Sequence, residues 1–152
     1  MRIRLEGEAA QVAFGRRLAE QLVPPCVIYL EGDLGAGKTT LVRGVLWGLG
    51  HEGAVRSPTY TLLEPYEIGR VHLYHLDLYR LADPEEIEFL GLRDLLDEQA
   101  MLFVEWPERG EDMLPPPDVR ARIAHAGEAR ILELAPQGLR GAGLVARLCE
   151  KD

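Results

Sequence analysis

The pattern of apolar and polar residues changes several times along the chain between the period of a strand and that of a helix. In the first third it predicts a strand, a helix, a buried strand and a second helix, at residues 2–6, 8–22, 26–30 and 38–49. The run at 26–30 is almost continuously apolar, which is typical of a strand covered on both faces of its sheet. A glycine-rich loop at residues 32–37 separates this strand from the next helix.

Later segments predict two antiparallel hairpins, a second buried strand and further helices. The hairpins are expected to pair residues 59–67 with 70–77 and residues 119–124 with 130–134, and a closing helix is expected at 139–148. Asp83 and Pro84 are typical of the N-cap and first position of a helix, which Gly91 then interrupts. Residues 101–104 are strongly apolar, and Glu105 follows them directly.

This order of elements is typical of an α/β nucleotide-binding protein, because a buried strand, a glycine loop and a helix are followed later by a buried strand with an acid at its end. We predict a three-layer core like that of P-loop NTPases, with a mixed and partly antiparallel sheet. A length of 152 residues and an apolar content of 47% suit a single P-loop ATPase domain over residues 1–152. Cys26 and Cys149 are expected to be reduced thiols of a cytoplasmic protein.

Charge and hydrophobicity narrow the range of partners. The net charge is −8 at pH 7 and the stretch 83–88 is acidic, whereas proteins that grip nucleic acid unaided usually carry a basic patch. Strong autonomous nucleic-acid binding is therefore not expected, although other subunits of a complex can hold the nucleic acid. No apolar run reaches the roughly 18 residues of a membrane span, and the first residues lack the apolar core of a signal peptide. We expect no membrane partner.

Lysine and hydroxyl side chains are scarce and concentrated. Of the 17 basic residues, only Lys38 and Lys151 are lysines, and all five Ser and Thr residues lie between positions 39 and 61. A chain that avoids these side chains elsewhere is expected to need them in this segment.

The glycine loop carries the clearest chemistry, because Gly32 to Thr39 fits the phosphate-binding pattern G-x-x-x-x-G-K-[ST] at every fixed position. A chance match in a chain of this composition has a probability on the order of 10⁻³. The backbone amides expected to wrap the phosphates are those of Gly35, Ala36 and Gly37. Lys38 is expected to bridge the β- and γ-phosphates, Thr39 to ligate Mg²⁺, and Thr40 to touch the α-phosphate.

Two acids are candidates for the metal and the reacting water. Glu105 ends a buried strand, where P-loop enzymes usually hold Mg²⁺, although a strand-end carboxylate can also simply face solvent. Asp77 ends the first hairpin, where it can orient the attacking water, bind Mg²⁺ through water, or only cap the next turn. His72, His75 and Asp77 also suggest a metal cluster, but a zinc site is not expected, because the odd spacing of His72 and Asp77 places them on opposite faces of a strand.

The remaining hydroxyls and one aromatic residue are candidates for contact with the nucleotide. Ser57 and Thr59 belong to a polar segment shortly after the loop helix, where nucleotide switches sense the γ-phosphate, unless the segment is only a Ser-Pro turn. Trp106 follows Glu105 and fits either the nucleotide site or the core. The chain has no Asn for a guanine-reading Asn-Lys-x-Asp motif, which favours ATP over GTP.

Five motifs together are similar to those of the bacterial TsaE family, formerly YjeE, the small ATPase of tRNA threonylcarbamoyladenosine biosynthesis. They are GDLGAGKTT (32–40), SPTYTL (57–62), HLDLYR (75–80), LADPEEIEFLG (81–91) and VEWPERG (104–110). They occur in the family's order, and the segment from Pro115 onward carries no further motif.

The resemblance implies an ATPase that works with the other subunits of the tRNA threonylcarbamoyl-transfer machinery and resets their complex, without transferring the group itself. It implies that Thr39 and Glu105 hold Mg²⁺, that Asp77 serves near the reacting water, and that Trp106 neighbours the site. The segment 57–61 would act as the switch. Slow hydrolysis by the chain alone is expected, with an arginine finger sought among Arg43, Arg56 and Arg80.

Two other functions remain open on the sequence. A small-molecule kinase shares the P-loop but usually carries an arginine-bearing lid, and residues 107–117 are short and acidic with Arg109 alone. A nucleotide sensor would bind ATP and partners without cleaving ATP. Phosphoryl transfer to a metabolite distinguishes the first alternative from an ATPase, and phosphate release distinguishes the second.

Overall fold

The computed structural model describes residues 1–150; Lys151 and Asp152 lie outside the described residues. Its strands form one mixed sheet in the order β1-β7-β6-β2-β5-β4-β3. The strands are β1 (Arg2–Glu6), β2 (Cys26–Glu31), β3 (Leu63–Ile68), β4 (Val71–Asp77), β5 (Ala100–Glu105), β6 (Val119–Ala126) and β7 (Ala129–Pro136). The central strands β6, β2, β5 and β4 run parallel, and antiparallel strands extend the sheet at both edges.

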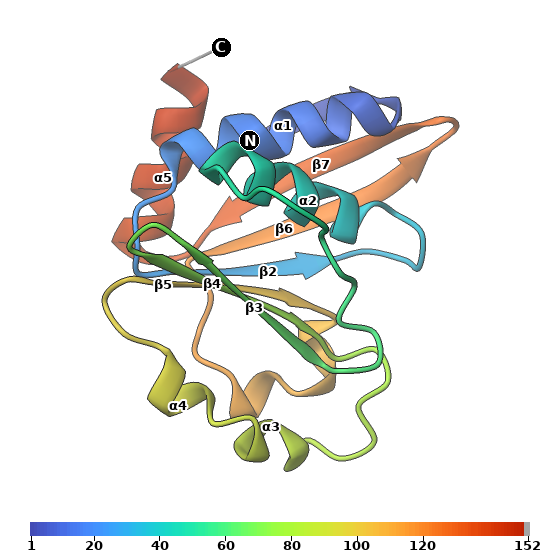
Figure 1. Ribbon diagram of the computed structural model, residues 1–152. Helices are drawn as coiled ribbons and strands as arrows, with labels where there is room; N and C mark the ends of the chain where they lie inside the picture. The colour runs from blue at the N-terminus through green and yellow to red at the C-terminus, as the bar shows by residue number, and fades with distance from the viewer. Residues whose placement is uncertain (151–152) are drawn as a thin grey trace.

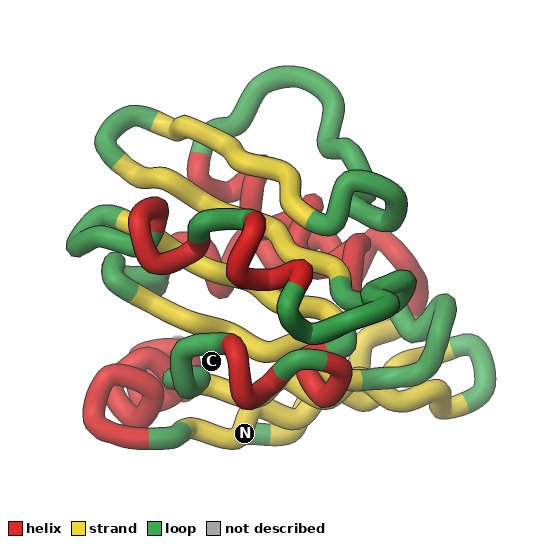
Figure 2. The backbone as a smooth tube through the Cα atoms, turned by 90° about the horizontal axis from the view of Figure 1, so that it is seen from below, coloured by secondary structure: helices red, strands yellow, loops and turns green. Residues whose placement is uncertain are grey.

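Helices cover the two faces of the sheet unequally, as Figure 1 shows. The long helices α1 (Gly7–Gln21), α2 (Lys38–Leu49) and α5 (Gly138–Glu150) lie on one face. On the other face lie α3 (Glu86–Phe89), α4 (Leu92–Leu95) and the 3₁₀ turns η1 (Pro107–Arg109) and η2 (Glu111–Met113). In the view from below, these short helices cross in front of the strands (Figure 2). Each face has its own apolar cluster, so the α/β three-layer prediction is confirmed.

The predicted elements are present, with one boundary that the alternation pattern places wrongly. The first hairpin strand begins at Leu63 and not at Thr59, because the preceding residues form a turn in which the Leu62 amide donates to the Pro58 carbonyl. Leu62 has a φ of 66°, a conformation that strands do not contain. Thr59 therefore lies in a loop beside the phosphate-binding loop and not in the sheet.

The helix predicted from Asp83 is present, but it is short and begins two residues later than expected, with Glu85 and not Asp83 at the N-cap. Asp83 accepts a hydrogen bond from the Glu85 amide, and Glu86 accepts one from the Asp83 amide, so these acids stabilise the turn that precedes the helix. The α-helical residues are limited to Glu86–Phe89, and α4 follows Gly91 as a separate turn. These turns lie under the sheet, away from α2.

Helices α1 and α2 pack with almost no side chain between them, where Gly15 of α1 faces Gly44 of α2. A Cβ added to Gly44 would lie 2.4 Å from the Val12 carbonyl oxygen, and one added to Gly15 would lie 2.5 Å from the Leu41 carbonyl oxygen. Glycine at both positions therefore allows α1 to approach the helix that carries the phosphate-binding loop.

We expect Gly44→Ala to lower the free energy of unfolding by about 2 kcal/mol, because the added methyl must push the two backbones apart. Urea denaturation followed by circular dichroism measures the change. Gly143→Ala in α5 is the control, since its Cβ would meet only the flexible end of Arg147, at 3.2 Å. Alanine favours a helix over glycine, so this control is expected to be neutral or stabilising. Equal stability of Gly44→Ala and wild type would contradict the packing argument.

Candidate functional site

The phosphate-binding loop and both candidate acids lie at the same edge of the sheet. The loop connects the end of β2 to the first residue of α2, Lys38. Parallel strands bring their carboxyl ends to one edge, and the register pairs Leu30 of β2 with Glu105 of β5, and Glu105 with Asp77 of β4. Ligands of open α/β sheets bind outside this edge.

Strand alternation points both acids toward α2. Leu73 in β4 and Phe103 in β5 belong to the apolar cluster beneath the long helices. Asp77 and Glu105 share the parity of these residues, and therefore face the same side of the sheet. Glu105 is 3% exposed, which excludes a strand-end carboxylate in solvent.

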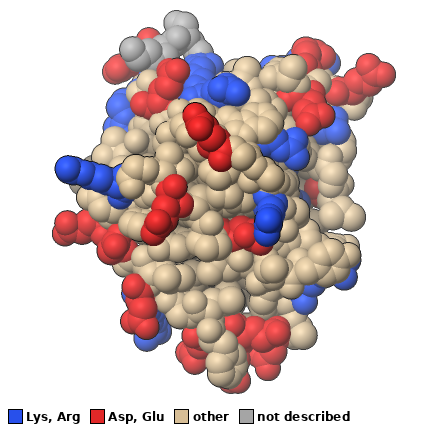
Figure 3. Space-filling model, viewed as in Figure 1, with Lys and Arg blue, Asp and Glu red and all other residues tan. Residues whose placement is uncertain are grey.

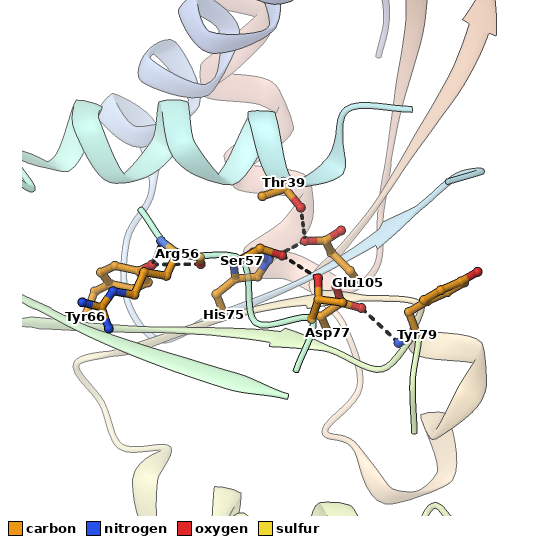
Figure 4. A network of polar contacts seen from close by, with 9 residues as sticks. Thr39, Arg56, Ser57, Tyr66, His75, Asp77, Tyr79 and Glu105 are labelled. Carbon is orange, nitrogen blue, oxygen red and sulfur yellow. Dashed lines mark hydrogen bonds and ion pairs between the residues drawn. The ribbon is translucent and has the colours of Figure 1, made fainter. Parts of the chain in front are cut away.

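Thr39 and Glu105 meet directly at the start of α2 (Figure 4). The Thr39 hydroxyl donates to Glu105 Oε2 at 2.9 Å, and the fully buried His75 places its Nε2 2.6 Å from the same oxygen. A carboxylate can accept both bonds, so Glu105 is held from the helix side and from the neighbouring strand.

Lys38, the first residue of α2, buries its side chain against the loop. Its ammonium group donates to the carbonyl oxygens of Gly32 and Asp33, and lies 3.8 Å from the centre of the Trp106 ring. Burial lowers the pKa of Lys38, and the nearby carboxylate of Glu105 opposes that shift. Trp106 has a φ of 58°, a strained backbone of the kind often found at functional sites. Its side chain lines the pocket and also packs against the apolar cluster on the side of the short helices.

Asp77 caps the turn after β4 and also lines the pocket. Its Oδ1 accepts the Tyr79 amide at 3.0 Å, so it caps the turn after β4. It also faces the pocket, and burial raises its pKa, with the like charge of Glu105 acting in the same direction. A buried carboxyl group with a raised pKa beside a second acid is typical of a functional site.

These residues line one pocket of about 340 Å³. Its lining consists of Leu34, Gly35, Ala36, Gly37, Lys38, Thr39, Thr40, Thr59, Asp77, Tyr79, Arg80, Glu105 and Trp106. Among the predicted site residues, Ser57 is not in this lining: it is exposed and bonds Thr59 at 2.6 Å. Ser57 can therefore influence the pocket through Thr59.

The structure separates the three candidate arginines. Arg80 lines the pocket, with its guanidinium 4.5 Å from the centre of the exposed Tyr60 ring. Arg43 forms an ion pair with Glu8 at 3.1 Å on the other side of the loop, and the backbone of Arg56 bonds Tyr66. Arg80 is the one of these three that faces the phosphate pocket.

A second hollow of about 290 Å³ adjoins the first across the loop. It shares Gly35, Gly37 and Thr40 with the phosphate pocket and is completed by Gly7, Glu8, Gln11, Arg43, Glu128 and Arg130. Arg130 donates to the Ala36 carbonyl at 3.1 Å, and Gln11 packs so tightly on Gly37 that a Cβ there would lie 1.9 Å from its Oε1. These contacts hold the loop from outside.

The sequence suggests His75 only as a member of a zinc cluster that is not expected, and it gives no indication of Gln11 or Arg130. His75 and Asp77 are two residues apart on one strand and therefore face the same side of the sheet, whereas His72 faces the other side. The alternation of the strand thus already places His75 beside the site. His72 indeed faces away, where it approaches Glu67 at 3.6 Å. Gln11 and Arg130 come from distant segments, and local patterns carry no signal for their contact with the loop.

The donor set suits a hard cation that shares its shell with phosphate. Within residues 1–150, no three His, Cys, Asp or Glu side chains gather as a metal cluster. A hydroxyl and a carboxylate at the mouth of a phosphate-binding loop instead fit Mg²⁺, which usually binds through few protein groups together with water and substrate oxygens. Thr39 and Glu105 are the residues that fit.

Comparison with known proteins assigns the chain to a family. The family model described as "Threonylcarbamoyl adenosine biosynthesis protein TsaE" matches residues 5–132. The chain belongs to the TsaE family. The predicted resemblance is thus confirmed, and all the site residues named above lie within the matched segment.

Two TsaE relatives and one solved structure indicate how far the similarity extends. The protein named tRNA threonylcarbamoyladenosine biosynthesis protein TsaE from Haemophilus influenzae is 46% identical over 91% of this chain and 91% of that protein. Its namesake from Bacillus subtilis is 44% identical over 69% of this chain and 65% of that protein. The crystal structure of Bacillus subtilis YdiB has a TM-score of 0.86 and 32% identity, and the match covers 100% of this chain and 95% of that one.

Proposed function

We propose that this member of the TsaE family is a Mg²⁺-dependent ATPase of tRNA threonylcarbamoyladenosine biosynthesis, and that it works with the other subunits of the threonylcarbamoyl-transfer machinery. Family membership supports the biosynthetic role. The single observation that supports ATP hydrolysis most strongly is the 2.9 Å bond between Thr39 and Glu105 at the mouth of a loop that also buries Lys38.

The loop residues bind and orient the triphosphate. The amides at the start of α2 and the helix dipole favour anionic oxygens, and Lys38 adds a positive charge that reaches the terminal phosphates. Thr39 and Glu105 would hold Mg²⁺, which when bound neutralises charge on the phosphate oxygens. Thr40, which is expected to touch the α-phosphate, lines both hollows. We therefore expect the β- and γ-phosphates in the first hollow and the nucleoside in the second.

Asp77 is positioned to act on the attacking water. Its Oδ1 is fixed by the Tyr79 amide, and its raised pKa makes the carboxylate a better proton acceptor than an exposed aspartate. Arg80 faces the same pocket and can stabilise charge that develops on the γ-phosphate. The site thus contains separate groups for phosphate binding and for water activation, which favours hydrolysis over a purely sensing role.

Exposed side chains at the entrance of the pocket support control of hydrolysis by a partner protein. Arg80 is stacked on Tyr60, whose side chain is 82% exposed, and Leu34 of the loop is 67% exposed. A partner that covers these apolar side chains would also fix Arg80. On the face seen in Figure 3, acidic and basic side chains are interspersed, so contact with tRNA through other subunits suits this surface better than direct binding.

Glu105→Gln is expected to weaken Mg²⁺-dependent ATP hydrolysis at least ~10-fold at limiting Mg²⁺, because the amide keeps the hydrogen bonds but removes the charge on the metal side. Phosphate release measured across a Mg²⁺ series tests this. Glu108→Gln is the control, since Glu108 is an exposed acid three positions further along the chain. An unchanged Mg²⁺ dependence in Glu105→Gln would contradict the metal role.

The proposed function is tested by phosphate release with and without the partner subunits, combined with nucleoside analysis of tRNA after depletion of this protein in its host. We expect slow release alone, faster release with partners, and loss of threonylcarbamoyladenosine from tRNA. Transfer of phosphate to a metabolite would indicate a kinase. ATP binding without any phosphate release, with partners present, would indicate a sensor.

A further inference from the structure

His75 is a buried polar residue that phosphate binding and water activation leave without a role. It lies in the middle of β4 with a fully buried side chain, on the face that looks toward α2. Its Nε2 is 2.6 Å from Glu105 Oε2, a short separation for a bond between an imidazole and a carboxylate. A core position of this kind normally holds an aliphatic side chain, so the imidazole calls for a physical reason.

The network determines which ring nitrogen carries the proton. An ionised carboxylate only accepts hydrogen bonds, so Nε2 is the donor to Glu105. Nδ1 has no hydrogen-bond partner within residues 1–150. A proton there would be a buried donor without an acceptor, which costs roughly 1–3 kcal/mol. The surroundings thus favour the tautomer that carries its proton on Nε2, an assignment inferred from the hydrogen bonds.

The two donors to Glu105 belong to different parts of the fold. Thr39 is on the phosphate-binding helix, and its oxygen is also the atom expected to face Mg²⁺. His75 is on β4, the strand that pairs in parallel with the strand of Glu105. Its bond to Oε2 thus comes from the sheet and not from the helix that carries the glycine loop.

We propose that His75 is a positioning residue for the magnesium site: it fixes the carboxylate of Glu105 before the nucleotide arrives. This inference rests on the proposed Mg²⁺-ATP function. Partners behind a metal ligand typically change metal affinity 10–100-fold when they are removed. The alternative, that His75 only fills space, predicts a change in stability without a specific change in Mg²⁺ binding.

Three substitutions separate these alternatives. His75→Leu removes the donor, and His75→Gln keeps an Nε2–H donor at the same number of bonds from the backbone. His75→Asn also carries an amide, but its nitrogen is one bond too short. The measurement is calorimetric titration with a non-hydrolysable ATP analogue, in Mg²⁺ and in EDTA.

For His75→Leu we expect the affinity gained from Mg²⁺ to fall ~10-fold or more, with the affinity in EDTA within about twofold of wild type. His75→Gln is expected to recover the gain to within about threefold. The inference would be overturned if Mg²⁺ raised the affinity for the analogue equally in His75→Leu and in wild type. It would also be overturned if His75→Leu lost the same fraction of its affinity in Mg²⁺ and in EDTA. If His75→Leu does not fold, the comparison is between His75→Gln and His75→Asn. The inference is overturned if Mg²⁺ raises the affinity of His75→Gln for the analogue no more than that of His75→Asn.

The outcomes also separate this inference from the proposed function. A wild-type protein that takes up no ATP analogue in either condition refutes the proposed function, and this inference with it. Mg²⁺-dependent uptake by wild type and by His75→Leu alike refutes only the role of His75. The nucleotide-free protein offers an independent reading: its imidazole ¹⁵N resonances should show a protonated Nε2 and a bare Nδ1, and the reverse pattern would overturn the assignment.

Discussion

Replacing Lys38 by alanine is expected to abolish ATP hydrolysis, with turnover at least ~10²-fold below wild type. The loss has two sources. The ammonium group is expected to meet the β- and γ-phosphates, and its charge is expected to matter more as negative charge develops in the transition state. Steady-state phosphate release at saturating ATP measures the effect, and calorimetry shows how much of it is lost binding.

Lys38→Met separates charge from packing. Methionine keeps most of the apolar stem that lies against Trp106, but it removes the ammonium group. We expect Lys38→Met to be as inactive as Lys38→Ala while retaining more of the wild-type thermal stability. Turnover close to wild type in Lys38→Met would show that the charge is not required and would contradict the phosphate role of this residue.

Replacing Asp77 by asparagine is expected to lower hydrolysis ~10²-fold while leaving ATP affinity within a few-fold of wild type. Asparagine can still accept the Tyr79 amide, so the turn after β4 is kept, but the group that accepts a proton from water is lost. Single-turnover phosphate release, compared with binding of the unhydrolysed nucleotide, checks this separation. Full turnover in Asp77→Asn would remove Asp77 from the chemistry.

The same substitution has a predicted effect on stability. Burial raises the pKa of Asp77 in the folded protein, so above the unfolded-state pKa of about 4 the native state binds more protons than the unfolded chain. Ionisation of Asp77 then costs native stability as the pH rises through the folded-state pKa. Without nucleotide, Asp77→Asn is expected to unfold at higher urea concentration than wild type at pH 7, and the difference should disappear below about pH 4.

Much of the fold follows from local pattern. The apolar runs at 26–30 and 101–104 correctly predict buried strands, because a strand that is covered on both faces of its sheet has few polar positions. The start of the first hairpin is not read correctly, because Thr59 to Leu62 continue the alternation while the backbone turns. The alternation of apolar and polar residues does not reveal that Leu62 has a positive φ, which ends the strand.

Some residues of the candidate site can be predicted from local sequence, and others depend on the tertiary structure. Lys38 and Thr39 are given by a contiguous motif, and Glu105 by its place after a buried strand, so sequence is sufficient for them. That Trp106 both lines the pocket and packs against the apolar cluster depends on its positive φ, which the sequence does not encode in a recognisable pattern. Gln11 touches the loop only because α1 packs closely on α2, which is a property of the tertiary structure.

The proposed ATPase activity depends on the binding of a magnesium-bound triphosphate by the segment from Gly32 to Thr39. The most direct test is a calorimetric titration of the purified protein with a non-hydrolysable ATP analogue, with and without Mg²⁺. We expect uptake at one site per chain, tighter in the presence of Mg²⁺ and strongly reduced in Lys38→Ala. A wild-type titration without measurable uptake in either condition, or uptake that Lys38→Ala leaves unchanged, would contradict the central claim.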